Sequence, residues 1–454
     1  MVTAYNIVDT LHGEKMAPRF RAAKTLHERY GTDIIGLPDS AMVITNSDRS
    51  SWICPRQGYY SHVVGLRSKP NAAMRFGSAF DNAMGMLFEF YANGRRFRGD
   101  NDRIADLTHA GVHELLAEQR EKAVSEEDYQ RILDDSEELN LSVYNALRGW
   151  IEEYENDFCE QWDVVGTQVK LAAPVVSGDK VFKSKVPVVQ GADAHGNVTW
   201  RLARAGDEQH RLVTLPWFQI CKLDALVQHK KTGQIVVWET KTSKTPEAYS
   251  RNLILDNQVP GYVRAVLYNL QEGNIVGTPS TRWVWDVTSS AKRPPPRLLK
   301  NGKYSKASNS RTPSWMWQDL LNDPDNPYAS GNTDDINEMR DNAALNIDEL
   351  FHYREYGSYT VDRLREYEIE LLADVRKYAA NLRAGASIDT VEDSAMHVAN
   401  AFPRQPYCRK PGGYCSFTAV CQSDNAFSRA EYVHSEPVVW LSTKAANHQE
   451  GGDA

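Results

Sequence analysis

The sequence predicts an α/β (α+β) fold in which strands and helices alternate through the middle of the chain. Residues 218–241 alternate apolar and polar side chains on either side of a Thr232-Gly233 turn signal, a pattern typical of a β-hairpin. A run with helical spacing opens near Gln258, and the strand-like segment 281–287 follows it. This β-β-α-β order predicts a mixed β-sheet flanked by helices.

Helices are expected before this hairpin, and strands directly in front of it. Residues 74–91 repeat apolar side chains at helical spacing, and residues 102–160 have a helical pattern throughout, which predicts a helical insert. Residues 162–228 are rich in strand-forming side chains. The candidate strands there are 164–165, 168–171, 186–189 and 212–215.

A loop region and a long helix are expected after the hairpin. Residues 288–335 are rich in Pro, Ser and Asn, with one short helix in the segment TPSWMWQDLL. Trp315 and Trp317 in that helix could stack on nucleobases, but a role as core anchors is favoured. Residues 360–384 form the clearest helix, with Thr360 as its N-cap. Its apolar stripe consists of Leu364, Tyr367, Leu371, Val375, Tyr378 and Leu382.

The length of 454 residues exceeds one typical domain. We expect an N-terminal appendage at 1–50, a main domain at 51–430 and a tail at 431–454. The main domain would contain the helical insert 102–160, a core at 162–287, a basic loop region at 288–335, C-terminal helices at 336–400 and a cysteine loop at 401–425. The chain has no run of eighteen apolar residues and no basic-then-apolar start. These features predict a cytoplasmic protein without a membrane span.

Two carboxylates face each other in the expected hairpin. Loops of two or of four residues both give a register in which Asp224 lies opposite Glu239, with β-carbons roughly 5 Å apart. No Arg stands between them, and a divalent cation such as Mg²⁺ or Mn²⁺ would neutralise the pair, because hard cations prefer oxygen ligands. Lys241, on the same face as Glu239, could stabilise negative charge on a phosphate. The alternative is an exposed hairpin with alternating charges.

A second motif follows the hairpin and suggests a family. Gln258 and Tyr262 are four residues apart, so both project from one face of the expected helix. Together with Asp224 and the segment Glu-Thr-Lys at 239–241, they resemble the PD-(D/E)xK nucleases, and in particular the RecB-like branch. The resemblance implies a restriction-endonuclease-like core and a metal-dependent deoxyribonuclease.

The same resemblance implies a role for each residue of the motifs. Asp224, Glu239 and the carbonyl group of Thr240 would be ligands of one or two Mg²⁺ or Mn²⁺ ions. Lys241 would be the catalytic lysine. Gln258 and Tyr262 would orient that lysine or the scissile strand.

One position departs from the RecB-like pattern. Members of that branch usually carry Gly-x-x-x-His on an early helix, where the His is a metal ligand. Here residues 77–81 read Gly-Ser-Ala-Phe-Asp, so Asp81 stands where the His would be. Asp81 could ligate Mg²⁺ or Mn²⁺ in its place, or it could be an ordinary surface residue of the helix; both interpretations stay open. Gln168 occupies a position similar to an early-strand Glu of the family.

The cysteines suggest a further centre. The six are Cys54, Cys159, Cys221, Cys408, Cys415 and Cys421. Cys408, Cys415 and Cys421 lie in one Gly/Pro-rich loop, and Cys54 lies in the segment SSWICPRQGYY. This arrangement resembles AddB-type nucleases and CRISPR-associated RecB-like exonucleases, which implies a structural 4Fe-4S cluster that joins the two ends of the domain.

Some features of the cysteines leave alternatives. The six-residue gap between Cys408 and Cys415 is longer than is usual in that group. A structural zinc could use the same four thiolates. Disulfides are disfavoured because nothing suggests secretion. Cys159 and Cys221 are interpreted as core residues.

The overall charge does not indicate a nucleic-acid binder, because the formal net charge is −8. A local basic segment nevertheless runs from residue 292 to 311, with no acidic residue between Asp286 and Asp319. Its first four cations are the predicted DNA-binding residues Lys292, Arg293, Arg297 and Lys300. A flexible basic loop without a ligand is the alternative.

Together these features predict an exonuclease that hydrolyses phosphodiester bonds of single-stranded DNA or duplex ends. The chain carries no phosphate-binding Gly-Lys-Ser/Thr loop and no helicase motif, so an ATP-driven helicase or recombination partner would be a separate chain. The lone nuclease architecture is similar to that of phage recombination, replication or defence proteins. The alternative is a catalytically inactive PD-(D/E)xK module for DNA binding or assembly.

Overall fold

The computed structural model describes residues 34–386 and five short segments beyond them. Within 34–386 the gaps are 39–40, 52–53, 65, 68–69, 123–129, 131–132, 134–135, 193–197, 204–209, 252–256 and 324–332. The further segments are 402–403, 409–410, 413–417, 420–421 and 432–434. Among the helices of these ranges, none has the length and apolarity needed to cross a bilayer.

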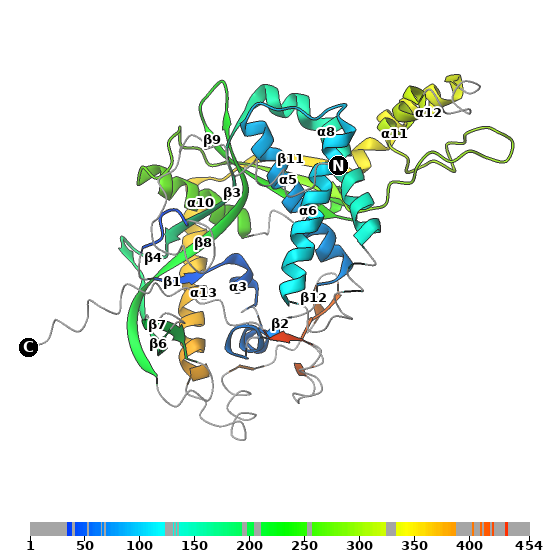
Figure 1. Ribbon diagram of the computed structural model, residues 1–454. Helices are drawn as coiled ribbons and strands as arrows, with labels where there is room; N and C mark the ends of the chain where they lie inside the picture. The colour runs from blue at the N-terminus through cyan, green and yellow to red at the C-terminus, as the bar shows by residue number, and fades with distance from the viewer. Residues whose placement is uncertain are drawn as a thin grey trace, which may run out of the picture.

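A mixed eight-stranded sheet forms the centre of the molecule (Figure 1). Its strands are β1 (Met42–Ile44), β3 (Trp162–Pro174), β6 (Lys183–Ala192), β7 (Val198–Leu202), β8 (Arg211–His229), β9 (Ile235–Ser243), β10 (Arg282–Ser289) and β11 (His352–Ser358). The main order is β11-β10-β9-β8-β6-β7, and β1 and β3 also pair with β8. The long strand β8 therefore connects the β9 side of the sheet to the β6 side.

The hairpin β8–β9 has the register that the sequence predicts. Ala225 pairs with Trp238, and Gln228 pairs with Ile235. Continuing this register by one residue places Asp224 opposite Glu239. Helix α10 (Gln258–Gln271) follows, and β10 then runs parallel to β9. The predicted β-β-α-β order and the mixed sheet are thus confirmed.

Three long helices cover one face of this sheet. They are α5 (Ala72–Ala92), α6 (Asn101–Lys122) and α8 (Ser136–Gln161), which correspond to the expected helix at 74–91 and the expected helical insert. Asn71 starts α5 as an N-cap, because its side chain accepts a hydrogen bond of 2.9 Å from the Met74 N–H. Phe88, Trp150 and Trp238 bring α5, α8 and β9 into one aromatic core.

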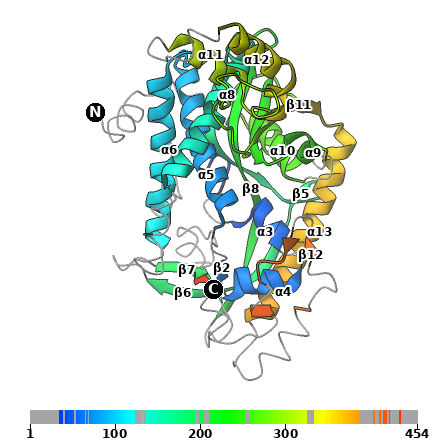
Figure 2. The ribbon, with the colours of Figure 1, turned by 90° about the vertical axis from the view of Figure 1, so that its right-hand side faces the viewer.

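Helices α10 and α13 (Val361–Ala386) pack on the other side of the strands (Figure 2). All six residues of the apolar stripe expected in the second helix are buried. The Thr360 hydroxyl accepts a hydrogen bond of 3.2 Å from the Arg363 N–H, which confirms Thr360 as its N-cap. Tyr378 of α13 contacts Trp217 of β8, with ring centroids 5.6 Å apart.

Two expectations about this architecture are wrong. Residues 42–50 are not part of an appendage: β1 pairs in parallel with β8, with Val43 opposite Phe218, and belongs to the central sheet. The segment 336–400 is not purely helical, because β11 adds an edge strand antiparallel to β10. Its mostly half-exposed side chains lack the apolar alternation that identifies a strand from sequence.

The short helix expected in the loop region is α11 (Ser314–Asn322), which packs with α12 (Thr333–Asn346) at one end of the molecule. Trp315 and Trp317 are both buried, as core anchors are. The remaining described elements are α3 (Asn46–Ser51), α4 (Pro55–Gly58), η1 (Tyr59–Val64), β2 (Leu66–Arg67), β4 (Val176–Ser177), β5 (Lys180–Val181), α9 (Pro246–Ser250), η3 (Asp348–Leu350), β12 (Arg409–Lys410), β13 (Gly413–Tyr414) and β14 (Val433–His434).

Segments from the two ends of the described chain lie side by side. The Arg56 Nε donates to the Phe402 carbonyl oxygen at 2.9 Å, and the Tyr60 hydroxyl donates to the Val420 carbonyl oxygen at 3.1 Å. Strand β2 also pairs with β14. The segment that carries Cys54 therefore packs against segments near the C-terminus.

Candidate active site

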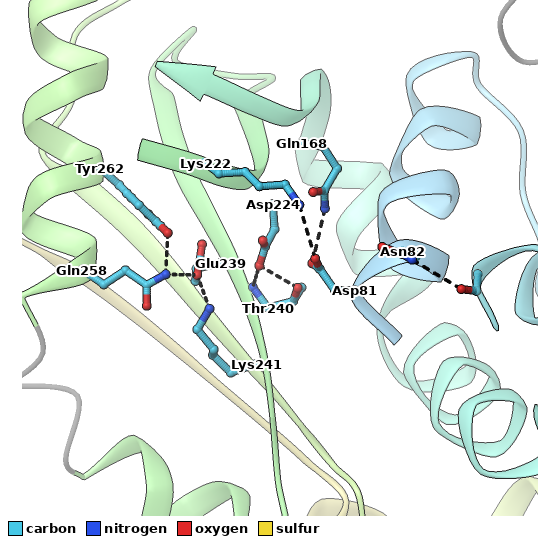
Figure 3. A network of polar contacts seen from close by, with 11 residues as sticks. Asp81, Asn82, Gln168, Lys222, Asp224, Glu239, Thr240, Lys241, Gln258 and Tyr262 are labelled. Carbon is cyan, nitrogen blue, oxygen red and sulfur yellow. Dashed lines mark hydrogen bonds and ion pairs between the residues drawn. The ribbon is translucent and has the colours of Figure 1, made fainter. Parts of the chain in front are cut away.

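Three carboxylates from different elements approach one another near the middle of the sheet (Figure 3). Asp224 comes from β8, Glu239 from β9 and Asp81 from α5. Asp224 is 8% exposed and Glu239 is 1% exposed. The alternative interpretation was an exposed hairpin with alternating charges. The burial of Asp224 and Glu239 contradicts it.

Asp224 is held by the strand next to it. Its Oδ2 accepts two hydrogen bonds from Thr240, one from the backbone N–H at 2.7 Å and one from the hydroxyl at 2.8 Å. These bonds keep the Asp224 carboxylate against strand β9, close to Glu239. Thr240 therefore lies in the site, where its N–H and its hydroxyl both donate to Asp224.

Glu239 has one occupied oxygen and one that lacks a partner. Its Oε1 accepts from the Lys241 ammonium and, at 2.9 Å, from the Gln258 Nε2. Gln258 in turn contacts the Tyr262 hydroxyl, one turn further along α10. The Oε2 of Glu239 is buried without a hydrogen-bond partner. A buried carboxylate oxygen in this state is costly unless a ligand binds it.

Asp81 joins the site through two residues that the sequence did not single out as ligands. The Gln168 Nε2 donates to Asp81 Oδ1 at 3.3 Å, and the Lys222 ammonium lies 3.8 Å from Asp81 Oδ2. Lys222 precedes Asp224 by two positions on β8. Because side chains two apart on a strand share a face, this spacing could have placed Lys222 beside the acids.

Gln168 reaches Asp81 because the β3 strand is irregular at this point. Its φ of 47° lies in the left-handed region, which is uncommon for a residue other than Gly. Gly85 of α5 leaves room for the side chain, since a Cβ at Gly85 would lie 3.2 Å from Gln168 Cγ. A strained backbone and a small neighbour thus bring Gln168 to α5.

The electrostatics show an excess of negative charge. Burial and the nearby Asp224 raise the pKa of Asp81 to about 7. Burial and Asp224 also raise the pKa of Glu239 well above its usual range. Burial alone would lower the pKa of Lys241, but Glu239 and Asp224 outweigh it and raise that pKa. Three carboxylates therefore lie near two ammonium groups, that of Lys241 at Glu239 and that of Lys222 at Asp81.

A divalent cation fits this set of donors. In the described part of the chain, no group of three or more His, Cys, Asp or Glu side chains stands close enough together to hold a metal ion. The partnerless Oε2 of Glu239 and the raised pKa values of Asp81 and Glu239 nevertheless mark a place that favours a positive charge. Carboxylate oxygens are ligands that Mg²⁺ and Mn²⁺ prefer.

A comparison with known families identifies this arrangement. The family model described as the PD-(D/E)XK nuclease superfamily matches residues 53–422, most of the chain. The chain belongs to this superfamily. The match includes Asp81, the hairpin acids and all four cysteines proposed as ligands. A search of curated proteins found no match to the chain.

The cysteines of this PD-(D/E)XK nuclease fall into two groups. Cys159 and Cys221 are buried, and burial raises the pKa of their thiols to about 11 and about 12, as expected for core cysteines. Cys415 and Cys421 pack on the buried cluster around Tyr60. Cys54, Cys415 and Cys421 form no disulfide. The described thiols are not arranged as a metal site, and Cys408 lies outside the described residues.

The basic segment of the nuclease differs from the expectation at one residue. Arg293 is only 5% exposed; its Nη1 donates to the Ser289 carbonyl oxygen at 3.0 Å, and its guanidinium lies over the Phe351 ring. This burial and packing count against a DNA contact at Arg293, where DNA binding remains an untested prediction. Lys292 forms an ion pair with Glu138, while Arg297 and Lys300 are exposed. For these three residues DNA binding stays a prediction.

Proposed function

We propose that this PD-(D/E)XK nuclease is a Mg²⁺- or Mn²⁺-dependent deoxyribonuclease of the RecB-like branch, acting as an exonuclease on single-stranded DNA or duplex ends. The observation that supports it best is the cluster of two buried acids, Asp224 and Glu239, with the partly buried Asp81, around Lys241. An uncompensated acidic group of this kind is unfavourable in a protein interior unless it binds a cation.

Each residue has a distinct role in this proposal. Asp224, Glu239 and Asp81, with the Thr240 carbonyl as a further candidate, would hold the cation, which would polarise the phosphodiester and neutralise charge. Lys241 stays charged and can stabilise the negative charge that develops on the phosphate. Gln258 orients Glu239 through its amide, and Tyr262 holds Gln258 in place.

Digestion of end-labelled DNA tests the proposal. Single- and double-stranded oligonucleotides labelled at the 5′ or 3′ end are incubated with Mg²⁺, Mn²⁺ or EDTA. We expect metal-dependent shortening from one end, which Lys241→Ala abolishes. Lys231→Ala, at the exposed turn of the same hairpin, serves as the matched control. Absence of cleavage with either metal would overturn the proposal.

We further propose that Cys54, Cys408, Cys415 and Cys421 hold a structural 4Fe-4S cluster, with zinc as the alternative. The packing of the Cys54 segment against the C-terminal segments supports a shared centre there. Protein prepared without oxygen should be brown, should contain iron and should lose both properties in Cys421→Ser. Zinc in place of iron in that preparation would favour the alternative.

Two observations favour a second candidate, the catalytically inactive DNA-binding or assembly module. The described side chains form no finished three-ligand metal group, and Asp81 replaces the family histidine. Such a module would bind labelled DNA equally well with or without metal and would leave it intact. The digestion experiment above separates the two candidates.

A further inference from the structure

Both carboxylate oxygens of Asp81 lie next to a nitrogen group from the sheet. The Gln168 Nε2 donates to Oδ1 at 3.3 Å, and the Lys222 ammonium lies 3.8 Å from Oδ2 (Figure 3). Glu239 differs, because its Oε2 is buried without a hydrogen-bond partner. The protein itself, through Lys222, thus supplies a positive charge directly beside Asp81.

Lys222 lies on the open side of the site. It precedes Asp224 by two residues on β8, so the two side chains share a face of the strand. On β3, Lys170 is its direct partner in the antiparallel register. Both lysines line a cavity of about 790 Å³, whose wall also includes Gln258 and Tyr262. Solvent and dissolved ions therefore reach Lys222 from this cavity.

Repulsion between the two lysines favours the contact of Lys222 with Asp81. Like charges directly opposite each other destabilise a sheet. Burial and the charge of Lys222 lower the pKa of Lys170, as expected when two ammonium groups repel each other. A carboxylate close to Lys222 offsets this repulsion, and Asp81 has that position.

The ion pair of Lys222 and Asp81 is weak enough to be exchanged. The two side chains are 50% and 32% exposed, and solvated pairs of this kind contribute little to stability. The pair of Arg354 and Asp286 is different, because its atoms lie 2.7 Å apart and its side chains are 7% and 0% exposed. A divalent cation carries twice the charge of an ammonium group and bonds carboxylate oxygens directly. Asp81 is therefore available to such a cation once its contact with Lys222 breaks.

We propose that Lys222 is a positioning residue that holds Asp81 in the metal-free protein, releases it when a divalent cation binds, and so weakens the binding of that cation. The inference rests on the proposed nuclease function and adds a residue that sets its metal affinity. Among the described residues, no three His, Cys, Asp or Glu side chains stand close enough together to hold a metal ion, as expected while Lys222 holds Asp81. The charge of Lys222 also repels a cation bound near Asp81.

Binding of Mn²⁺ without DNA tests this role separately from cleavage. The full-length protein is titrated with Mn²⁺, and the electron paramagnetic resonance signal of the free ion gives the dissociation constant. Lys222→Gln should bind Mn²⁺ about 10-fold more tightly than the wild type, the order expected when one charge near a divalent ion is removed from a solvated site. Lys222→Arg keeps the charge and should keep the wild-type affinity.

Lys170→Gln is the matched control. It removes the same charge from the strand that faces Lys222, but it leaves the ion pair at Asp81 in place. Its gain in Mn²⁺ affinity should be clearly smaller than that of Lys222→Gln. An equal gain in the two variants would show a general effect of the local charge and would overturn the positioning role.

A double-mutant cycle tests whether Lys222 acts through Asp81. In an Asp81→Asn background, the change Lys222→Gln should raise Mn²⁺ affinity much less than it does in the wild type, because no ion pair remains to be broken. The full gain in that background would contradict the inference. Thermal melting in EDTA checks folding, and Lys222→Met, which keeps an aliphatic side chain, replaces Lys222→Gln if that variant does not fold.

The outcomes distinguish this inference from the proposed function. If Lys222→Gln binds Mn²⁺ with the wild-type affinity while the wild type cleaves DNA, the positioning role is wrong and the nuclease stands. If the wild type binds Mn²⁺ with the expected dependence on Lys222 but cleaves with neither metal, the nuclease proposal fails and the positioning role stands. A wild type that binds no Mn²⁺ at millimolar concentrations overturns the positioning role.

Discussion

Two buried acidic residues on neighbouring strands, Asp286 of β10 and Glu239 of β9, are neutralised in different ways. Both are 1% exposed. Asp286 Oδ2 accepts from Arg354 Nη2 at 2.7 Å and from Trp150 Nε1 at 2.7 Å. The guanidinium of Arg354 also lies 3.6 Å from the centre of the Tyr154 ring. This acid has its own buried cation inside an aromatic cage.

Glu239 has no cation to itself. It shares the Lys241 ammonium with Asp224 and Asp81. Each acid has one buried oxygen without a hydrogen-bond partner, Oε2 of Glu239 and Oδ1 of Asp286, so the difference between them lies in the counter-charge. One acid is therefore balanced within the protein, and the other belongs to a group that is balanced only when a cation binds. Burial of a charged group is therefore not by itself a sign of function. A buried charge without a counter-charge of its own is the stronger sign.

Glu239→Gln should lower the rate of DNA cleavage by about 10³-fold or more, because it removes a metal ligand and the partner of Lys241. The metal-free protein should not lose stability, since the raised pKa of Glu239 shows that its buried charge is unfavourable. Single-turnover cleavage with Mg²⁺ and thermal melting in EDTA measure the two effects. A large loss of stability would show that Glu239 is structural.

Asp286→Asn should behave in the opposite way. It leaves the Arg354 guanidinium buried without its counter-ion, which typically costs about 3–5 kcal/mol of unfolding free energy. Urea denaturation measures this loss. The double variant Asp286→Asn/Arg354→Met should recover much of it, and no recovery would indicate that the ion pair is not the cause.

Asp81→Asn should change the pH dependence of stability in EDTA. A carboxyl with a folded-state pKa of about 7 binds more protons in the native than in the unfolded state, where the pKa is about 3.9. The free energy of unfolding of the wild type should therefore fall as pH rises from about 4 to about 7. Because the Asp81 side chain is about one-third exposed, screening limits the effect, and at pH 8 the variant should be more stable by about 1–2 kcal/mol.

The control for Asp81 is the same comparison at low pH. Near pH 4 both proteins carry a neutral group at this position, so urea denaturation should give nearly equal stabilities. A difference that is the same at pH 4 and pH 8 would rule out this titration. Added Mg²⁺ should stabilise the wild type more than the variant at pH 8.

Gln168→Gly should give the smallest effect, a gain of up to about 1 kcal/mol in stability. Gly adopts a positive φ without the strain that Gln168 carries. The same change removes the hydrogen bond to Asp81, so cleavage should slow by about 10-fold. Urea denaturation and cleavage rates measure both, and a variant that is less stable yet fully active would contradict this account.

Several parts of the site could be predicted because they depend on local geometry. The turn at Thr232-Gly233 and the alternation of the strands determine the register that places Asp224 opposite Glu239. The four-residue spacing of Gln258 and Tyr262 determines that they share a helical face. The same periodicity explains why the buried stripe of α13 was predicted in full.

The remaining parts depend on contacts between distant segments. Asp81 and Gln168 are 87 residues apart, and their hydrogen bond follows from an irregular strand that meets Gly85. The cavity of about 790 Å³ likewise brings together residues of β3, β8 and α13 that are far apart in the sequence. Composition alone does not predict whether a basic side chain is exposed. Arg293 lies in a basic segment, yet it is buried and its guanidinium packs over the Phe351 ring.

Local periodicity therefore accounts for the fold class, the hairpin register and the pairing of the two acids, because repeats of two and 3.6 residues act within a segment. Packing between distant elements sets which charged groups meet, as it does for Asp81 and Gln168, for Lys170 opposite Lys222, and for Asp286 with Arg354. Such contacts depend on how whole elements pack, and the energy of a buried charge depends on everything that surrounds it.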